Sequence, residues 1–113
     1  MSIIIYHNPR WGKSRESVKI LEKSNKSFTI IEYLKDGLAY DELVDLLKKL
    51  NLSPIDIIRT NDSDYKDNYK KEMKNSELIE LIVSYPKIFE RPIIIKGDRA
   101  VIGRPPENIY KIL

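Results

Sequence analysis

The stretch Ile3–Arg15 (IIIYHNPRWGKSR) decides the fold, because it joins a strand, a loop and the start of a helix. Its apolar run Ile3–Tyr6 predicts a short strand that is buried on both faces. Residues 12–24 follow with helical periodicity, and Phe28–Tyr33 is rich in β-branched and aromatic residues, which predicts a second strand. A connection of this length makes the two strands parallel, with a right-handed crossover.

The middle of the chain is predicted to be helical. The leucines of residues 43–50 recur at helical spacing and form one apolar stripe, and Ser53–Pro54 marks the start of a short helix. Residues 62–74 are polar and charged, which is typical of a weak surface helix or an ordered loop. Asn75 or Ser76 is expected to cap a further helix, which the following proline stops.

The end of the chain returns to strands. Pro92–Lys96 predicts a strand, Gly97–Asp98 a tight turn and Arg99–Ile102 its antiparallel partner, before Pro105 opens a last helix. The order β-α-β, helices, β-β-α predicts an α/β protein with a thioredoxin-like fold. In this chain we expect a four-stranded mixed sheet, with the helical residues of about 40–86 between strands 2 and 3. Residues 1–113 are expected to form this single domain.

Composition limits the chemistry. The chain has 113 residues and no cysteine, which excludes disulfides, cysteine–metal sites and any reaction that needs a thiolate from this chain. Its net charge of +3 suits a small anionic ligand, whereas a nucleic-acid-binding protein usually shows a denser basic face. No apolar stretch approaches the roughly 20 residues that span a bilayer, and no targeting signal is visible. The sequence therefore predicts a cytoplasmic protein that binds neither membrane nor nucleic acid.

The loop His7–Arg15 is the first candidate site. It lies at the carboxyl end of the first predicted strand and at the start of the first predicted helix, where open α/β sheets bind ligands. The N–H groups of a first helical turn can hold an anion, and Arg10, Lys13 and Arg15 add positive charge. The alternative is an ordinary strand-to-helix loop with exposed basic residues.

Three arginines form the second candidate set. Arg59 ends a short predicted helix, while Arg91 and Arg104 each precede a proline beside a predicted strand. A guanidinium presents a planar fork of donors that suits an oxyanion, but each arginine taken alone fits a solvated surface charge equally well. His7, the one histidine, is interpreted first as a hydrogen-bonded structural residue.

Two blocks of the sequence resemble the glutaredoxin-dependent arsenate reductase family, of the ArsC type. The first is Tyr6–Arg10 followed by Gly12–Arg15, and the second is Glu90–Ile95 followed by Gly97–Asp98 and Ile102–Glu107. Residues 50–59 resemble the central helices of the same family, so the resemblance covers essentially the whole chain. The Spx regulators, which bind RNA polymerase, share the fold but match these blocks less well.

The resemblance implies a set of site residues. Family members use a cysteine at the loop–helix junction to attack arsenate, and glutathione with glutaredoxin then completes the reduction to arsenite. The matching position here is Trp11. The resemblance places His7 in the catalytic site, beside the thiol that it tunes, and makes Pro92 a cis-proline. It assigns anion binding to Gly12, Lys13, Ser14, Arg59, Arg91 and Arg104.

Trp11 departs from the pattern at the step that defines the activity. Indole offers no nucleophile to replace a thiolate, so the chain is predicted to be a catalytically silent homologue. A basic pocket for arsenate, phosphate or sulfate is expected to persist in a monomer without a metal or bound cofactor, leaving glutathione and glutaredoxin unused. One alternative is a genuine arsenate reductase whose cysteine was replaced by a recent or introduced change. The other is an Spx-like module that contacts RNA polymerase.

Two opposed predictions follow for the Trp11 side chain. As a binding residue it would project outward and anchor a partner. As a structural residue it would fold over the former pocket and stack on Arg91 or Arg104, which is the favoured prediction.

Overall fold

A four-stranded mixed sheet organises the two terminal parts of the chain. The computed structural model describes residues 2–113, which divide into one compact unit formed by the residues up to Asp36 with Arg91–Leu113 and a second formed by Gly37–Glu90. The strand order of the sheet is β2-β1-β3-β4, with β1 parallel to β2 and antiparallel to β3. The elements of this unit are β1 (Ile3–Tyr6), α1 (Gly12–Lys23), β2 (Phe28–Ile31), α2 (Tyr33–Asp36), β3 (Ile93–Lys96), β4 (Arg99–Ile102) and the 3-10 helix η3 (Pro106–Lys111).

The strand register aligns one row of residues at each end of the sheet. At the end where β1 begins, the paired residues are Phe28, Ile3, Lys96 and Arg99. We call this the lysine end. At the end where β1 finishes, the paired residues are Ile31, Tyr6, Ile93 and Ile102. We call this the loop end, because the loop that leads to α1 leaves the sheet here.

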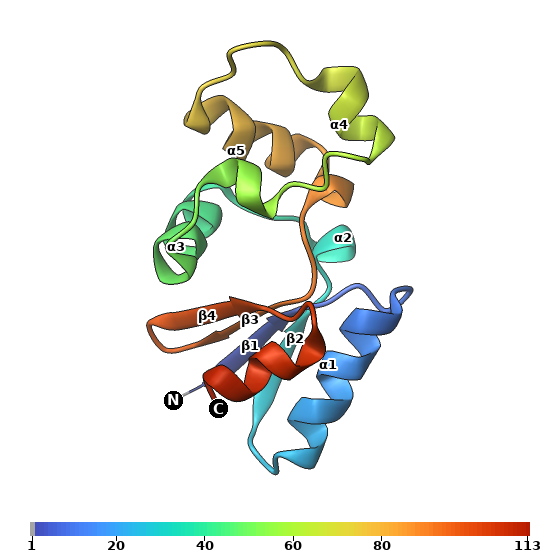
Figure 1. Cartoon of the computed structure of the whole chain (residues 1–113), viewed down its shortest axis with the longest axis vertical. Coiled ribbons are helices and arrows are strands. Elements are labelled where there is room, and N and C mark those ends of the chain that lie inside the picture. Colours follow the sequence, from blue (N-terminus) through green and yellow to red (C-terminus); the bar gives the residue numbers. More distant parts are fainter. Residues whose placement is uncertain (1) are drawn as a thin grey trace. The chain divides into compact units, whose positions relative to one another are not determined.

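One face of the sheet is covered by α1 and by η3, the last turn of helix drawn in red in Figure 1. Side chains from both helices meet sheet residues in a common core, and the most deeply buried of them lie at alternating strand positions, as a half-covered pleat requires. The buried core residues are Ile3, Ile5, Leu21, Ile94, Ile109 and Ile112.

The second unit is helical. Leu43, Leu46 and Leu47 are buried, which confirms the predicted stripe, and Ile58 pairs with Phe89 in an isolated antiparallel bridge. The elements are α3 (Tyr40–Leu50), the 3-10 helix η1 (Pro54–Ile57), α4 (Ser63–Asn68), α5 (Asn75–Ser84) and the 3-10 helix η2 (Pro86–Ile88).

The predicted α/β class and thioredoxin-like arrangement are confirmed, since a parallel β-α-β half and an antiparallel β-β-α half share one sheet, with helices between strands 2 and 3. The second strand, however, was predicted to reach Tyr33 and ends at Ile31. The carbonyl of Glu32 accepts the N–H groups of Lys35 and Asp36, at 3.0 and 2.9 Å, and so begins a helical turn. Tyr33 lies inside that turn and is fully buried, so its aromatic character reflects packing and not a strand.

The expected cap of the helix near residue 75 is also corrected. Asn75 is the first helical residue, and the capping position belongs to Lys74. The Lys74 N–H donates to Oε1 of Glu77, at 3.0 Å, so a carboxylate three residues onward satisfies the start of the helix without an Asn or Ser cap. The last helix begins at Pro106 and is a 3-10 helix.

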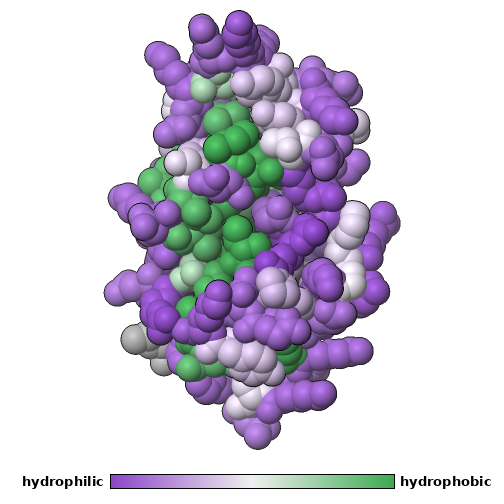
Figure 2. Space-filling view, in the orientation of Figure 1, coloured by the Kyte–Doolittle hydropathy of each residue, from purple (hydrophilic) through white to green (hydrophobic). Residues whose placement is uncertain are grey.

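The surface drawn in Figure 2 is mostly hydrophilic, with a smaller share of apolar residues. Within residues 2–113, no helix has the length and apolar character needed to cross a bilayer. The described residues also contain no group of three or more His, Cys, Asp or Glu side chains placed to hold a metal ion.

Candidate functional site

The loop after β1 is fixed by backbone hydrogen bonds. The His7 N–H donates to the Ile31 carbonyl, at 2.9 Å, and extends the parallel pairing one residue beyond β1. Asn8 then closes a tight turn, because its Oδ1 accepts the Arg10 N–H at 3.1 Å and its carbonyl accepts the Trp11 N–H at 3.1 Å. The turn delivers Trp11 to the position immediately before α1.

His7 is held by Ser14 in the buried base of this loop. The His7 Nδ1 lies 2.6 Å from Oγ of Ser14, and the same Oγ accepts the Asn8 N–H at 3.0 Å. Ser14 therefore bridges the His7 ring and the backbone of Asn8 through one oxygen. Ser14 is fully buried and His7 is 8% exposed, so the hydrogen bond expected of His7 is present.

The electrostatic environment favours neutral His7. Burial lowers the pKa of His7 below its usual value of 6.5, and the nearby positive charge of Arg15 acts in the same direction. The carboxylate of Glu32 opposes both by raising the pKa. Glu32 and His7 line a cavity of about 330 Å³ together with Asn8, Arg10 and Lys35, so this side of the loop presents charges of both signs.

Trp11 stacks on Arg91. The guanidinium carbon of Arg91 lies 3.9 Å from the centroid of the indole ring, and Arg91 itself is 3% exposed. The predicted stacking on an arginine is therefore confirmed for Arg91. The ring is nevertheless 46% exposed, so Trp11 covers the arginine on one side and presents an accessible surface on the other.

Arg91 and Arg104 are brought to the same end of the sheet by the β3–β4 hairpin. Arg91 comes shortly before β3 and Arg104 shortly after β4, and the Gly103 N–H donates to the Pro92 carbonyl at 2.8 Å. The Arg91–Pro92 peptide bond is cis, and so is the Arg104–Pro105 bond, which was not anticipated. Arg104 is exposed, in contrast to Arg91.

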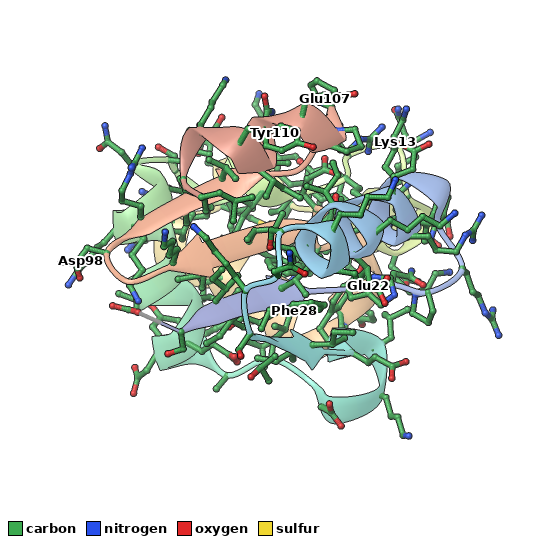
Figure 3. The ribbon with its side chains drawn as sticks, turned by 90° about the horizontal axis from the view of Figure 1, so that it is seen from below. Lys13, Glu22, Phe28, Asp98, Glu107 and Tyr110 are labelled. Carbon is green, nitrogen blue, oxygen red and sulfur yellow. The ribbon has the colours of Figure 1, made fainter. Side chains whose placement is uncertain are left out.

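The basic residues at the start of α1 have local partners. Lys13 is exposed, points outward in Figure 3 and lies 3.9 Å from Glu16, which is a weak exposed pair. The Nη1 of Arg15 donates to the Pro9 carbonyl at 3.1 Å and so holds the loop against the helix. Gly12 is exposed and contributes backbone only, at the end of the helix where the N–H groups lack an intrahelical acceptor.

Arg59 belongs to the second unit, formed by Gly37–Glu90. There its guanidinium lies 3.6 Å from the carboxylate of Asp62, and its backbone N–H donates to the Ile88 carbonyl at 2.7 Å. Asp62 also caps α4 by accepting the Asp64 N–H at 2.9 Å. This arginine therefore has a structural environment of its own within that unit.

Three residues of the site were not singled out from the sequence. Glu32 faces His7, and its signal was a carboxylate directly after a strand. Gly103 must lack a side chain, because a Cβ there would lie 2.9 Å from both Cγ of Pro92 and Oγ of Ser17. Ser17 is fully buried and donates to the Lys13 carbonyl at 3.0 Å. The only signal for Ser17 is that a serine occupies the inner face of α1.

Comparisons with known proteins agree with this geometry. Arsenate reductase of Haemophilus influenzae is 41% identical to this chain over 118 residues, with full coverage of both proteins. Arsenate reductase of Escherichia coli is 32% identical over 114 residues, which cover 99% of this chain and 81% of that protein. The structure of arsenate reductase from Vibrio cholerae superposes with a TM-score of 0.95 at 34% identity, covering 100% of this chain and 98% of the other. A profile of the ArsC family matches residues 6–112, and the chain belongs to that family.

Proposed function

We propose that this chain is a catalytically silent arsenate reductase homologue that binds a small oxyanion at the loop end of the sheet without reducing it. The observation that carries the proposal is the stack of Trp11 on buried Arg91, at the position where the family resemblance places the nucleophile. The indole stands where a thiolate would have to form a bond to arsenic. No cysteine elsewhere in the chain can replace it.

The binding part of the proposal rests on groups that do not depend on sulfur. A guanidinium carries its N–H donors in its own plane, which is the direction used to bind an oxyanion, and the Cζ of Arg91 lies 3.9 Å from the centroid of the Trp11 ring. The start of α1 supplies N–H groups and the positive end of a 12-residue helix. Arg104, which follows β4, adds an exposed guanidinium to the buried one of Arg91. Arsenate, phosphate and sulfate all match these donors.

The remaining features of the proposal come from family membership. Glutathione and glutaredoxin, the reductants that the resemblance assigns to the family, are left unused because no sulfur–arsenic bond can form. Residues 1–113 act as one monomeric thioredoxin-like domain of the cytoplasm, with an insertion at about residues 40–86. Arsenate incubated with this chain, glutathione and glutaredoxin should yield arsenite only at the background rate.

Binding is tested by calorimetry and by the fluorescence of Trp11, the one tryptophan of the chain. Arsenate, phosphate or sulfate at millimolar concentration should give saturable heat together with a saturable change in Trp11 emission. Arg91→Gln should abolish the emission change. Arg99→Gln removes the same charge at the lysine end and should preserve it. The absence of saturable heat and of any emission change with all three anions would overturn the proposal.

A further inference from the structure

A second cavity, of about 440 Å³, lies at the lysine end of the sheet. Its lining includes the apolar residues Ile3 and Phe28, which we call the apolar floor. The polar lining residues include Lys26, Lys96 and the exposed residues Ser27 and Thr29. These residues come from the starts of β1 and β2, the end of β3 and the turn between α1 and β2. The cavity therefore lies at the opposite end of every strand from the loop that carries Trp11.

The fold builds this cavity from one row of the sheet. Phe28, Ile3 and Lys96 are directly paired across β2, β1 and β3, and paired residues point to the same face. Ile3 is buried in the core beneath α1 and η3, and Phe28 packs against that core. The turn after α1 is tied by the Lys26 N–H, which donates to Oγ of Ser24 at 3.3 Å. Lys26 is thus placed beside the apolar floor, next to Lys96.

The two lysine amines lie close together without a compensating carboxylate in the cavity. The neighbouring side chain of Lys26 lowers the pKa of Lys96, and burial and the positive charges of Lys26 and Arg99 act in the same direction. None of the described residues that line the cavity is acidic. Asp98, at the tip of the β3–β4 turn, points outward in Figure 3, away from the start of β2 that Phe28 marks.

Holding two like charges beside an apolar floor is unfavourable, and a bound anion relieves the repulsion. Two ammonium groups supply several donors, which suits the oxygens of a doubly charged phosphoryl group better than a single carboxylate. The volume exceeds that of one small ion and falls within the range of ligand pockets. The aromatic floor supplied by Phe28 offers contact to an apolar substituent.

We propose that the cavity at the lysine end binds a phosphoryl group between Lys26 and Lys96. This site is separate from the oxyanion site proposed at the loop end and does not depend on it. The phosphoryl group could come from free phosphate or from a small phosphate ester whose apolar part contacts Phe28. The chemistry of recognition is the same for both sources.

The test is an NMR titration of the full isotopically labelled chain with inorganic phosphate and, in parallel, with phenyl phosphate, at matched ionic strength. The amides of Ser27, Thr29 and Lys96 should shift in a saturable manner at millimolar ligand. Tighter binding of phenyl phosphate identifies an ester as the ligand, whereas equal binding identifies free phosphate, and either result supports the site. Saturable shifts confined to the loop of residues 7–14 would overturn this proposal and leave the loop-end site supported. No saturable shifts anywhere in the chain would overturn both sites.

Charge-removing variants distinguish phosphate binding at a defined site from nonspecific attraction by the net charge of the chain. The double variant Lys26→Gln/Lys96→Gln should weaken phosphate binding at these amides by at least about tenfold, because two charge-assisted contacts are lost. The matched control, Lys70→Gln/Lys71→Gln, removes the same charge from exposed positions of the second unit and should preserve the affinity. Equal weakening by both double variants would show that net charge alone attracts phosphate, and would sink the proposal.

Discussion

The two ends of the sheet carry positive charge in different ways. At the loop end, Arg91 is 3% exposed and covered by Trp11, and Arg15 is tied to a loop carbonyl. At the lysine end, Lys26 and Lys96 lie together over an apolar floor. The charges at the loop end are thus stabilised by ring stacking and hydrogen bonds, whereas those at the lysine end are destabilised by each other. Packing therefore preorganises the basic residues at the loop end, whereas the two lysine charges at the lysine end are left for a bound anion to neutralise.

The largest expected effect comes from restoring a sulfur at the loop end. Trp11→Cys places a thiol before α1, above the positive end of the helix and beside Arg91, where its pKa should fall. Arsenite production with glutathione and glutaredoxin should rise at least about 10³-fold over the parent chain, since loss of a nucleophile elsewhere costs about 10⁶ in kcat. A coupled assay for arsenate reduction measures it.

Trp11→Ser is the matched control for that gain. It opens the same space and removes the same stack on Arg91, but provides no thiolate. It should remain at the background rate. A folded Trp11→Cys protein that is no more active than Trp11→Ser would show that more than the nucleophile has been lost at the loop end.

The next effect concerns the packing that positions Arg91 and Arg104. Gly103→Ala places a Cβ 2.9 Å from Cγ of Pro92 and should lower the free energy of unfolding by about 1–3 kcal/mol. The control is Gly12→Ala, where the nearest atom is the flexible end of Arg15 at 3.8 Å. It should be neutral or stabilise α1 by up to about 1 kcal/mol, because alanine favours a helix over glycine. Denaturant unfolding distinguishes the two, and equal stability of both variants would contradict the close packing.

Much of the fold follows from sequence periodicity alone. The run Ile3–Tyr6, the helix of residues 12–23 and the hairpin of residues 93–102 all occur where they were predicted, because local pattern and tertiary burial agree there. Tyr33 misled the prediction of the second strand, since an aromatic residue suits a strand by propensity but here fills the core from a helical turn.

The candidate site was less accessible to sequence reasoning. The resemblance gave its residue types, but only coordinates show that Trp11 lies on Arg91 and not on Arg104. The roles of Glu32 and Gly103 depend on long-range pairing between strands, which leaves no local pattern. Lys26 and Lys96 are far apart in the sequence, so no spacing rule predicts that they line one cavity.

A smaller effect should appear in the pH dependence of stability at the loop end. His7 has a folded pKa below its unfolded value of 6.5, so the unfolded state binds more protons in this range. The stability that neutral His7 contributes is fully present above pH 6.5 and is lost as the pH falls through the lower folded pKa. His7→Asn removes the titrating group while keeping a polar atom near Ser14. Because the chain has no other histidine, unfolding curves of the variant should lose this decline. An identical decline in both proteins would assign it to carboxylates instead.

The smallest expected effect has opposite signs at the two ends of the sheet. Lys96→Gln removes one of two mutually repelling charges and should slightly raise the free energy of unfolding, most clearly at low ionic strength, where screening is weakest. Arg91→Gln removes a charge that stacks on Trp11 and should lower the free energy of unfolding by about 0.5–2 kcal/mol. Saturating phosphate should reverse the first result, because the parent chain then gains binding energy at the lysine end that Lys96→Gln lacks. Urea unfolding at low and high salt, with and without phosphate, measures all of these differences. Destabilisation by Lys96→Gln in phosphate-free, low-salt buffer would mean that Lys96 is already satisfied within the chain, and the contrast between the two ends would no longer hold.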